Sequence, residues 1–119
     1  KNANDKKLTE IALELSALSS KVRDKKITPE SLEGGTFSIS NLCGIGTSSI
    51  FPLVSHPHVA ILGVAASTME PIFIKDNFEP RLMMPITIGF DHRIINGADA
   101  ARFLQYIKHL LQDWFLWNL

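Results

Sequence analysis

The fold is decided by residues 82–97, whose sequence is LMMPITIGFDHRIING. The first nine residues are mostly apolar and predict a strand, which is followed by a histidine and an amide four residues apart. His92 ends the strand, and Asn96 lies in a turn that we expect Gly97 to stop. A histidine held by a strand can act as a base with little motion, and its ordinary pKa of about 6.5 suits work near neutral pH. From these residues alone, a structural histidine is the commoner alternative.

Helices are predicted on both sides of this stretch. Residues 98–114 carry an apolar stripe at helical spacing, formed by Ala100, Phe103, Ile107, Leu110 and Trp114 and widened by Ala101, Leu104 and Leu111. Residues 5–23 carry a second stripe, formed by Leu8, Ile11, Leu15, Leu18 and Val22. Thr28 followed by Pro29 predicts one short helical turn, which Gly34-Gly35 stops.

The remaining segments favour strands. Residues 36–40 alternate, with Phe37 and Ile39 on one face and the hydroxyl side chains on the other. Residues 59–66 are almost all apolar, which predicts a strand buried on both faces, and residues 50–54 predict a short extended segment. Residues 71–74, a turn at Asp76-Asn77 and the run from Phe78 predict a hairpin that leads into the histidine strand. This order of elements predicts one α/β sandwich with a mixed sheet.

Composition narrows the class of protein. The chain has 119 residues, of which 45% are hydrophobic and 20% charged, and 12 basic residues balance 12 acidic ones. The balanced charge argues against nucleic-acid binding, and the lack of an 18-residue apolar run argues against a membrane span. One cysteine allows no internal disulfide and favours a reducing compartment. The start lacks both a methionine and a signal-peptide profile, so we expect the chain to begin inside a longer protein.

Four motifs in order, at residues 34–42 (GGTFSISNL), 58–64 (HVAILGV), 80–85 (PRLMMP) and 91–98 (DHRIINGA), carry a family resemblance. The chain resembles the dihydrolipoamide acyltransferase (E2) component of 2-oxo acid dehydrogenase complexes, and is most similar to the bacterial pyruvate dehydrogenase type. The resemblance implies a chloramphenicol acetyltransferase-like fold. It also implies that residues 1–119 are the C-terminal half of the catalytic domain. The lipoyl domain, the peripheral subunit-binding domain and the first half of the catalytic domain would then lie outside this sequence.

The same resemblance implies the chemistry, which is transfer of an acetyl group between dihydrolipoamide and coenzyme A. His92 would be the general base that deprotonates the attacking thiol, whose ordinary pKa is about 8.5. Ser40 would donate a hydrogen bond to the oxyanion. Asn96, the third catalytic residue, stands where most members carry aspartate, and its amide could hydrogen-bond a thiol, the intermediate or the backbone. Apart from the resemblance, Asp91 and Arg93 flank His92 on the opposite strand face, so we expect them to brace the turn rather than touch substrate. Coenzyme A would be a substrate whose contact residues are not assigned, the lipoyl group would be carried on an absent domain, and no metal is expected.

Partners and location also follow from the resemblance. A homotrimer is implied, in which His92 of one subunit meets Ser40 of its neighbour across the interface. The apolar end, residues 114–119, would dock in a neighbouring trimer and build a 24-subunit cubic core, the alternative being a helix end packed on its own core. E1 and E3 components would bind through absent domains. We expect a bacterial cytoplasmic protein, or a mitochondrial matrix protein if the source is eukaryotic.

Other candidate groups carry less. His56 and His58 have a metal-like spacing, but no carboxylate or cysteine nearby completes a ligand set. Cys43 is expected to be structural, the loop 44–46 lacks the lysine of a phosphate-binding loop, and His109 is expected to be solvated. Three other functions remain open: an assembly or scaffold fragment that is inactive without the missing half, the E2 of another 2-oxo acid complex, and a stand-alone acyltransferase acting on a small hydroxyl or amine.

Overall fold

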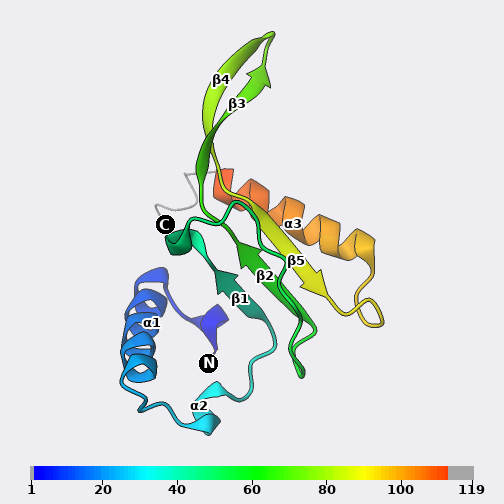
Figure 1. Ribbon diagram of the computed structural model, residues 1–119. Coiled ribbons are helices and arrows are strands. Elements are labelled where there is room, and N and C mark those ends of the chain that lie inside the picture. The colour runs from blue at the N-terminus through cyan, green and yellow to red at the C-terminus, as the bar shows by residue number, and fades with distance from the viewer. Residues whose placement is uncertain (1, 113–119) are drawn as a thin grey trace. The chain divides into compact units, whose positions relative to one another are not determined.

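The computed structural model describes residues 2–112 and divides the chain into two compact units, Lys1–Gly35 and Thr36–Leu119. The first unit contains a 3-10 turn, Ala3–Asp5, and two helices, α1 (Leu8–Arg23) and α2 (Pro29–Leu32). The second contains β1 (Ser38–Asn41), the 3-10 turn Cys43–Ile45, β2 (Ala60–Val64), β3 (Thr68–Ile74), β4 (Asn77–Met83), β5 (Ile86–Phe90) and α3 (Gly97–Gln112) (Figure 1). None of the helices described here has the length and apolarity that crossing a membrane requires. The predicted docking segment, residues 114–119, lies outside the described residues.

In the first unit the predicted long helix begins at Leu8 rather than near Asp5. Lys6 has an extended backbone, with φ −111° and ψ 147°, which separates the 3-10 turn from α1. The Glu10 carboxylate accepts a hydrogen bond from the Lys7 amide at 2.8 Å, which satisfies a free N–H at the start of the helix. The predicted apolar stripe of α1 is present, but none of its residues is buried. The short helix begins at Pro29 as predicted.

The second unit is built on a three-stranded sheet in the order β1-β2-β5. β1 runs parallel to β2, and β2 runs antiparallel to β5, so the mixed sheet predicted from the sequence is confirmed. The central strand β2 is the most buried element, with Ala60 at 2% and Leu62 at 7% exposure, as its apolar sequence predicted. Helix α3 packs against β5, and Phe103 of α3 stacks edge-on with Phe37 at 5.6 Å between ring centroids.

The segment at residues 50–54 was predicted to be a short extended segment, and it forms no strand. It is an irregular stretch that crosses the sheet where two glycines leave room. A Cβ atom on Gly63 would lie 2.7 Å from Cγ2 of Ile50, and one on Gly89 would lie 2.6 Å from the Pro52 carbonyl oxygen. Because the segment lies this close, it covers the sheet instead of pairing with its edge, and Ile50 is buried.

Strands β3 and β4 form the predicted hairpin, which projects beyond the three-stranded sheet (Figure 1). Ile74 pairs with Asn77, so the two turn residues are Lys75 and Asp76, both with positive φ, and not Asp76-Asn77 as predicted. A two-residue turn with positive φ at both positions matches the twist of the strands it joins. One face of the hairpin carries only apolar side chains, contributed by Met69, Pro71, Phe73, Phe78, Pro80 and Leu82.

Candidate active site

His92 lies in the turn that follows β5, close to the start of α3. The Asp91 amide donates to the Val59 carbonyl at 2.9 Å, so the β2–β5 ladder continues up to the residue before the histidine. The imidazole is exposed, and its ring centroid lies 5.4 Å from that of Phe90 at an interplanar angle of 44°. A Cβ atom on Gly97 would lie 3.9 Å from His92 Nε2, so the first residue of α3 lies beside this nitrogen. His92 was predicted to end the strand, and it lies two residues beyond the end of β5, directly after the last hydrogen bond of the ladder.

Asp91 and Arg93 brace this turn, as predicted. The Asp91 carboxylate accepts hydrogen bonds from the Arg93 amide at 3.0 Å, from Nε at 2.9 Å and 3.1 Å, and from Nη2 at 2.6 Å. These hydrogen bonds to the guanidinium and the amide, together with the charge of the guanidinium, lower the pKa of Asp91 to about 2. The brace is therefore fully ionised across the range in which an imidazole titrates.

Asn96 was predicted to lie in a turn stopped by Gly97, and this prediction is wrong because Gly97 is the first residue of α3. The Asp99 amide donates to Asn96 Oδ1 at 2.9 Å, and Asn96 Nδ2 donates to Asp99 Oδ2 at 2.5 Å. The Asn96 side chain is thus the N-cap of the helix, a position that favours asparagine. Both polar atoms of the amide are used in this cap, and Asp99 also pairs with Arg102 at 2.8 Å.

Ser40 lies on the half-buried face of β1, whereas Ile39 on the opposite face is 68% exposed. The sheet register places Ser40 level with Gly63 of β2 and hence with Thr87 of β5. Asp91 is four residues beyond Thr87, which is about 13 Å along the strand, and two strand spacings add about 10 Å across the sheet. Ser40 and His92 are therefore separated by on the order of 15 Å, so they do not meet within one chain, as predicted.

Sequence reasoning missed a pair at the opposite end of β1. The Ser38 hydroxyl and His58 Nδ1 share a hydrogen bond in a half-buried setting. No signal in the sequence pointed to this pair, because the register of two parallel strands cannot be read from either strand alone. His58 therefore has a structural hydrogen-bond partner in Ser38. Within residues 2–112, no three His, Cys, Asp or Glu side chains gather as a metal site.

Cys43 has the structural role predicted for it. Its thiol donates to the Ala65 carbonyl oxygen at 3.0 Å, and its amide donates to Asn41 Oδ1 at 3.0 Å. These two bonds tie the loop after β1 to the end of β2. The thiol is half-buried and faces a carbonyl oxygen rather than a base, which is the environment of an inert cysteine.

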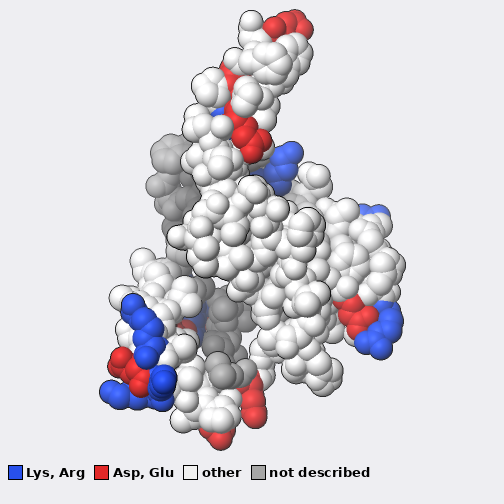
Figure 2. Space-filling view, in the orientation of Figure 1, with Lys and Arg blue, Asp and Glu red and all other residues white. Residues whose placement is uncertain are grey.

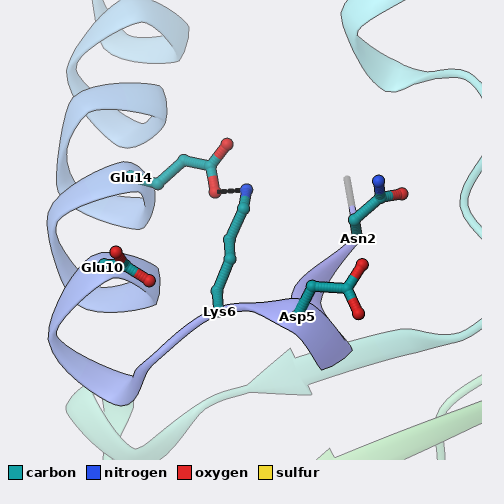
Figure 3. A pocket seen from close by; sticks show the side chains of 5 residues that line it. All are labelled: Asn2, Asp5, Lys6, Glu10 and Glu14. Atoms are coloured by element: carbon teal, nitrogen blue, oxygen red, sulfur yellow. Dashed lines mark hydrogen bonds and ion pairs between the residues drawn. The ribbon is translucent and has the colours of Figure 1, made fainter.

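The described part of the chain includes the following two hollows. One, of about 510 Å³, lies between the β4–β5 junction and the last turns of α3, and its lining includes Leu82, Met84, Ile86, Leu104 and Leu111. The other, in the first unit, is an open hollow lined by charged and amide side chains and crossed by an ion pair between Lys6 and Glu14 (Figure 3). That lysine lowers the pKa of Glu14. Charged side chains gather on α1, whereas the visible face over the three-stranded sheet is nearly free of them (Figure 2).

Known proteins are similar to this chain in sequence and in fold. The family model for the 2-oxoacid dehydrogenases acyltransferase (catalytic domain) matches residues 1–119. The dihydrolipoyllysine-residue acetyltransferase component of the Haemophilus influenzae pyruvate dehydrogenase complex is 48% identical over 113 residues, which are 95% of this chain and 20% of that protein. The chain thus spans about a fifth of the length of this curated relative.

Solved structures of the same family have a fold similar to that of this chain. Azotobacter vinelandii dihydrolipoamide acetyltransferase (E2p), studied for the role of a serine, a histidine and an asparagine in its catalytic mechanism, superposes with a TM-score of 0.91 at 42% identity, over 95% of this chain and 46% of that one. The cubic core of a pyruvate dehydrogenase multienzyme complex gives 0.90 at 43% identity, over 94% and 46%. The predicted α/β fold of the chloramphenicol acetyltransferase type is confirmed. The chain belongs to the 2-oxoacid dehydrogenase acyltransferase (catalytic domain) family.

Proposed function

We propose that residues 1–119 are the C-terminal half of an acyltransferase catalytic domain that moves an acetyl group between dihydrolipoamide and coenzyme A in the core of a pyruvate dehydrogenase-type complex. One observation carries this proposal. In the Azotobacter enzyme, the serine precedes the histidine and the asparagine follows it by the same numbers of residues that separate Ser40, His92 and Asn96 here. The geometry supports it, because His92 stands exposed at the end of a strand on a braced turn.

The reaction begins with the thiol of one substrate. His92 accepts the S–H proton while the sulfur attacks the thioester carbonyl carbon of the other substrate. The carbonyl oxygen becomes an oxyanion, to which the Ser40 hydroxyl donates a hydrogen bond. When the tetrahedral intermediate collapses, the carbon–sulfur bond to the leaving thiol breaks, and the imidazolium returns the proton to that sulfur. The acetyl group is thereby exchanged between two thiols without a metal or a change of oxidation state.

Asn96 contributes to this site through the backbone in our proposal. Its side chain caps α3, and a capped helix holds the residues that follow His92 in one conformation. An amide in this position cannot accept a proton, so His92 works without a neighbouring carboxylate on that side. The arrangement therefore relies on orientation of the imidazole rather than on an acid–imidazole couple.

We further propose that the site is completed by a second subunit. Ser40 and His92 lie on the order of 15 Å apart within one chain by the sheet register, so a single subunit cannot use both on one substrate. A cyclic homotrimer would bring the serine of one subunit to the histidine of the next, and trimers would associate into a 24-subunit core through residues 114–119. The lipoyl group and the E1 and E3 components would be bound through parts of the protein beyond this sequence. The expected location is the bacterial cytoplasm, or the mitochondrial matrix in a eukaryote.

The test is acetyl transfer from acetyl-coenzyme A to dihydrolipoamide by the natural full-length protein. His92→Ala should lower kcat by about 10²–10⁴-fold, because a positioned general base is lost. His109→Ala is the matched control, since that histidine is also exposed but lies on α3. Equal rates for the wild type and His92→Ala would end the catalytic assignment.

Mixing two inactive variants tests the shared site. Ser40→Ala and His92→Ala subunits, unfolded and reassembled together in equal amounts, should recover about one quarter of the wild-type rate, because one site in four receives an intact serine and an intact histidine. Each variant reassembled alone should stay inactive. No recovery in the mixture would show that the two residues do not act across an interface.

A further inference from the structure

We infer that Asp91 and Arg93 are positioning residues that fix the imidazole of His92 for proton transfer, without touching substrate. This inference rests on the proposed function of His92. In addition, the kcat of the reaction would depend on the ion pair between Asp91 and Arg93, the two residues that flank the histidine. Several separate hydrogen bonds converge on Asp91, and His92 lies among them.

The backbone of Asp91 holds both ends of the turn. Its amide is bound to the Val59 carbonyl at 2.9 Å, which anchors it to the buried strand β2. Its carbonyl oxygen accepts from the Ile94 amide at 3.0 Å and from the Ile95 amide at 2.9 Å. His92 therefore lies inside a closed loop of hydrogen bonds that starts and ends at one residue.

The carboxylate of Asp91 adds a second set of hydrogen bonds across the same turn, to Arg93. It accepts from the amide and from two side-chain nitrogens of Arg93, so the guanidinium is held in a two-point geometry beside the histidine. Two other acid–arginine pairs in the chain offer a comparison, Glu79–Arg81 at 2.6 Å and Asp99–Arg102 at 2.8 Å. The Asp91 side chain is 21% exposed, against 45% and 58% for the acids of those pairs. Asp91 is therefore the least exposed acid of the three pairs, and it also accepts a hydrogen bond from the backbone amide of its arginine.

The ring of His92 shows how the brace acts. Among the hydrogen bonds of the described residues, none joins the Asp91 carboxylate to the imidazole, so Asp91 does not share a proton with the base. The ring instead lies near Phe90, and its Nε2 lies beside Gly97. Fixing the backbone of residues 91–95 fixes the Cα–Cβ bond from which this ring extends. Displacement of a reacting group by about 1 Å can cost about 100-fold in rate.

The kinetic test uses the natural full-length protein and the acetyl transfer assay. Asp91→Asn keeps an acceptor for the Arg93 amide but removes the charge, and Arg93→Lys keeps the charge but removes the two-point geometry. Each should lower kcat by about 10–100-fold while the KM for coenzyme A changes less than about twofold, because orientation and not binding is lost. Glu79→Gln is the matched control, since it breaks an acid–arginine pair of the same spacing on the hairpin. It should leave kcat unchanged.

A second readout separates this inference from the proposed function. Acylation by diethyl pyrocarbonate, followed at each histidine by peptide mass spectrometry, reports on the ring of His92, with His56, His58 and His109 as internal references. In Asp91→Asn and Arg93→Lys the rate should rise at His92 alone. That rise in a protein without acetyl transfer would uphold the positioning role and reject the acetyltransferase proposal. Active variants with kcat within twofold of wild type, or an unchanged His92 acylation rate in both variants, would overturn the positioning role.

Discussion

The three-stranded sheet and the β3–β4 hairpin are both regular, yet they differ in what covers them. In the sheet, the central strand has Ala60 at 2% exposure, because α3 packs on β5 and residues 50–52 cross the sheet at its glycines. In the hairpin, Met69, Phe73, Phe78 and Leu82 share one face and are 62–72% exposed. The comparison shows that strand pairing is set locally by the turn and the register, whereas burial depends on a second layer.

The exposed apolar face of the hairpin indicates that the hairpin requires a packing partner for stability. A two-stranded ribbon is only marginally stable in water by itself, and an apolar face of this size is typical of a surface that packs against another element or chain. No residue in the described range 2–112 covers it. Covered and uncovered strands should therefore respond differently to the same kind of substitution.

The largest effect is expected where the sheet is covered most closely. Gly89→Ala would place a methyl group 2.6 Å from the Pro52 carbonyl oxygen, so the crossing segment must move away. Overpacking of this kind typically costs about 1–3 kcal/mol of unfolding free energy. Urea unfolding followed by circular dichroism measures it. Gly44→Ala is the control, because no atom lies within 4 Å of the added methyl group and the cost should be small.

The next effect concerns the helix that covers the sheet. Asn96→Ala removes the N-cap of α3 and should cost about 1 kcal/mol, whereas Asn96→Asp should retain most of the stability because aspartate caps equally well. The same urea series measures both. If Asn96→Ala unfolds at the wild-type urea concentration but loses acetyl transfer, the asparagine acts on substrate and not as a cap.

A smaller effect is expected in the hairpin. Phe73 and Phe78 stack edge-on at 5.3 Å, and such a pair contributes about 0.5–1 kcal/mol beyond its burial. A double-mutant cycle with Phe73→Leu and Phe78→Leu should give a coupling energy of that size. A loss above about 3 kcal/mol in Phe73→Ala or Phe78→Ala, as expected for core phenylalanines, would mean that the exposed face is buried by a partner in the assembled protein.

The smallest effect is a change with pH at the end of the sheet. The pKa of Asp91 is about 2 in the fold and about 3.8 without its partner. A lowered pKa stabilises the fold above the ordinary value, and that contribution is lost as the pH falls from about 4 to 2. Amide hydrogen exchange at Ile94 and Ile95, which bind the Asp91 carbonyl, should lose protection in this window. In Arg93→Met the protection should be low already at pH 5, and a wild-type profile there would reject the brace.

Much of the architecture could be predicted from the sequence. The buried strand β2 was predicted because residues 59–66 lack polar side chains, and the two long helices because their apolar residues recur at helical spacing. The presentation of His92 at the end of a strand followed in the same way. The separation of Ser40 from His92 within one chain was predicted from the family resemblance, and the register of β1 with β2 and of β2 with β5 accounts for it.

The misses have physical causes. The sequence predicted a short extended segment at residues 50–54 but not its course, because the crossing depends on the missing side chains of Gly63 and Gly89, which lie on other strands. Gly97 was expected to stop the turn before a helix that begins at about residue 98, whereas the Asn96–Asp99 cap makes Gly97 the first residue of that helix. The turn at Lys75-Asp76 was shifted by one residue because asparagine is the more usual residue at positive φ. The Ser38–His58 bond depends on a parallel register that local sequence does not encode.

The strand connections also set an order of folding. Residues 74 and 77 of the hairpin meet after a two-residue turn, and such turns close in about 1–10 μs. The partners of β2 are far along the chain, since β1 is joined to it by residues 42–59 and β5 by the whole hairpin. Long-range pairings form more slowly because loop closure must come first. The nascent chain should therefore display its most apolar ribbon before its central sheet exists, which makes that ribbon the segment that a chaperone meets first.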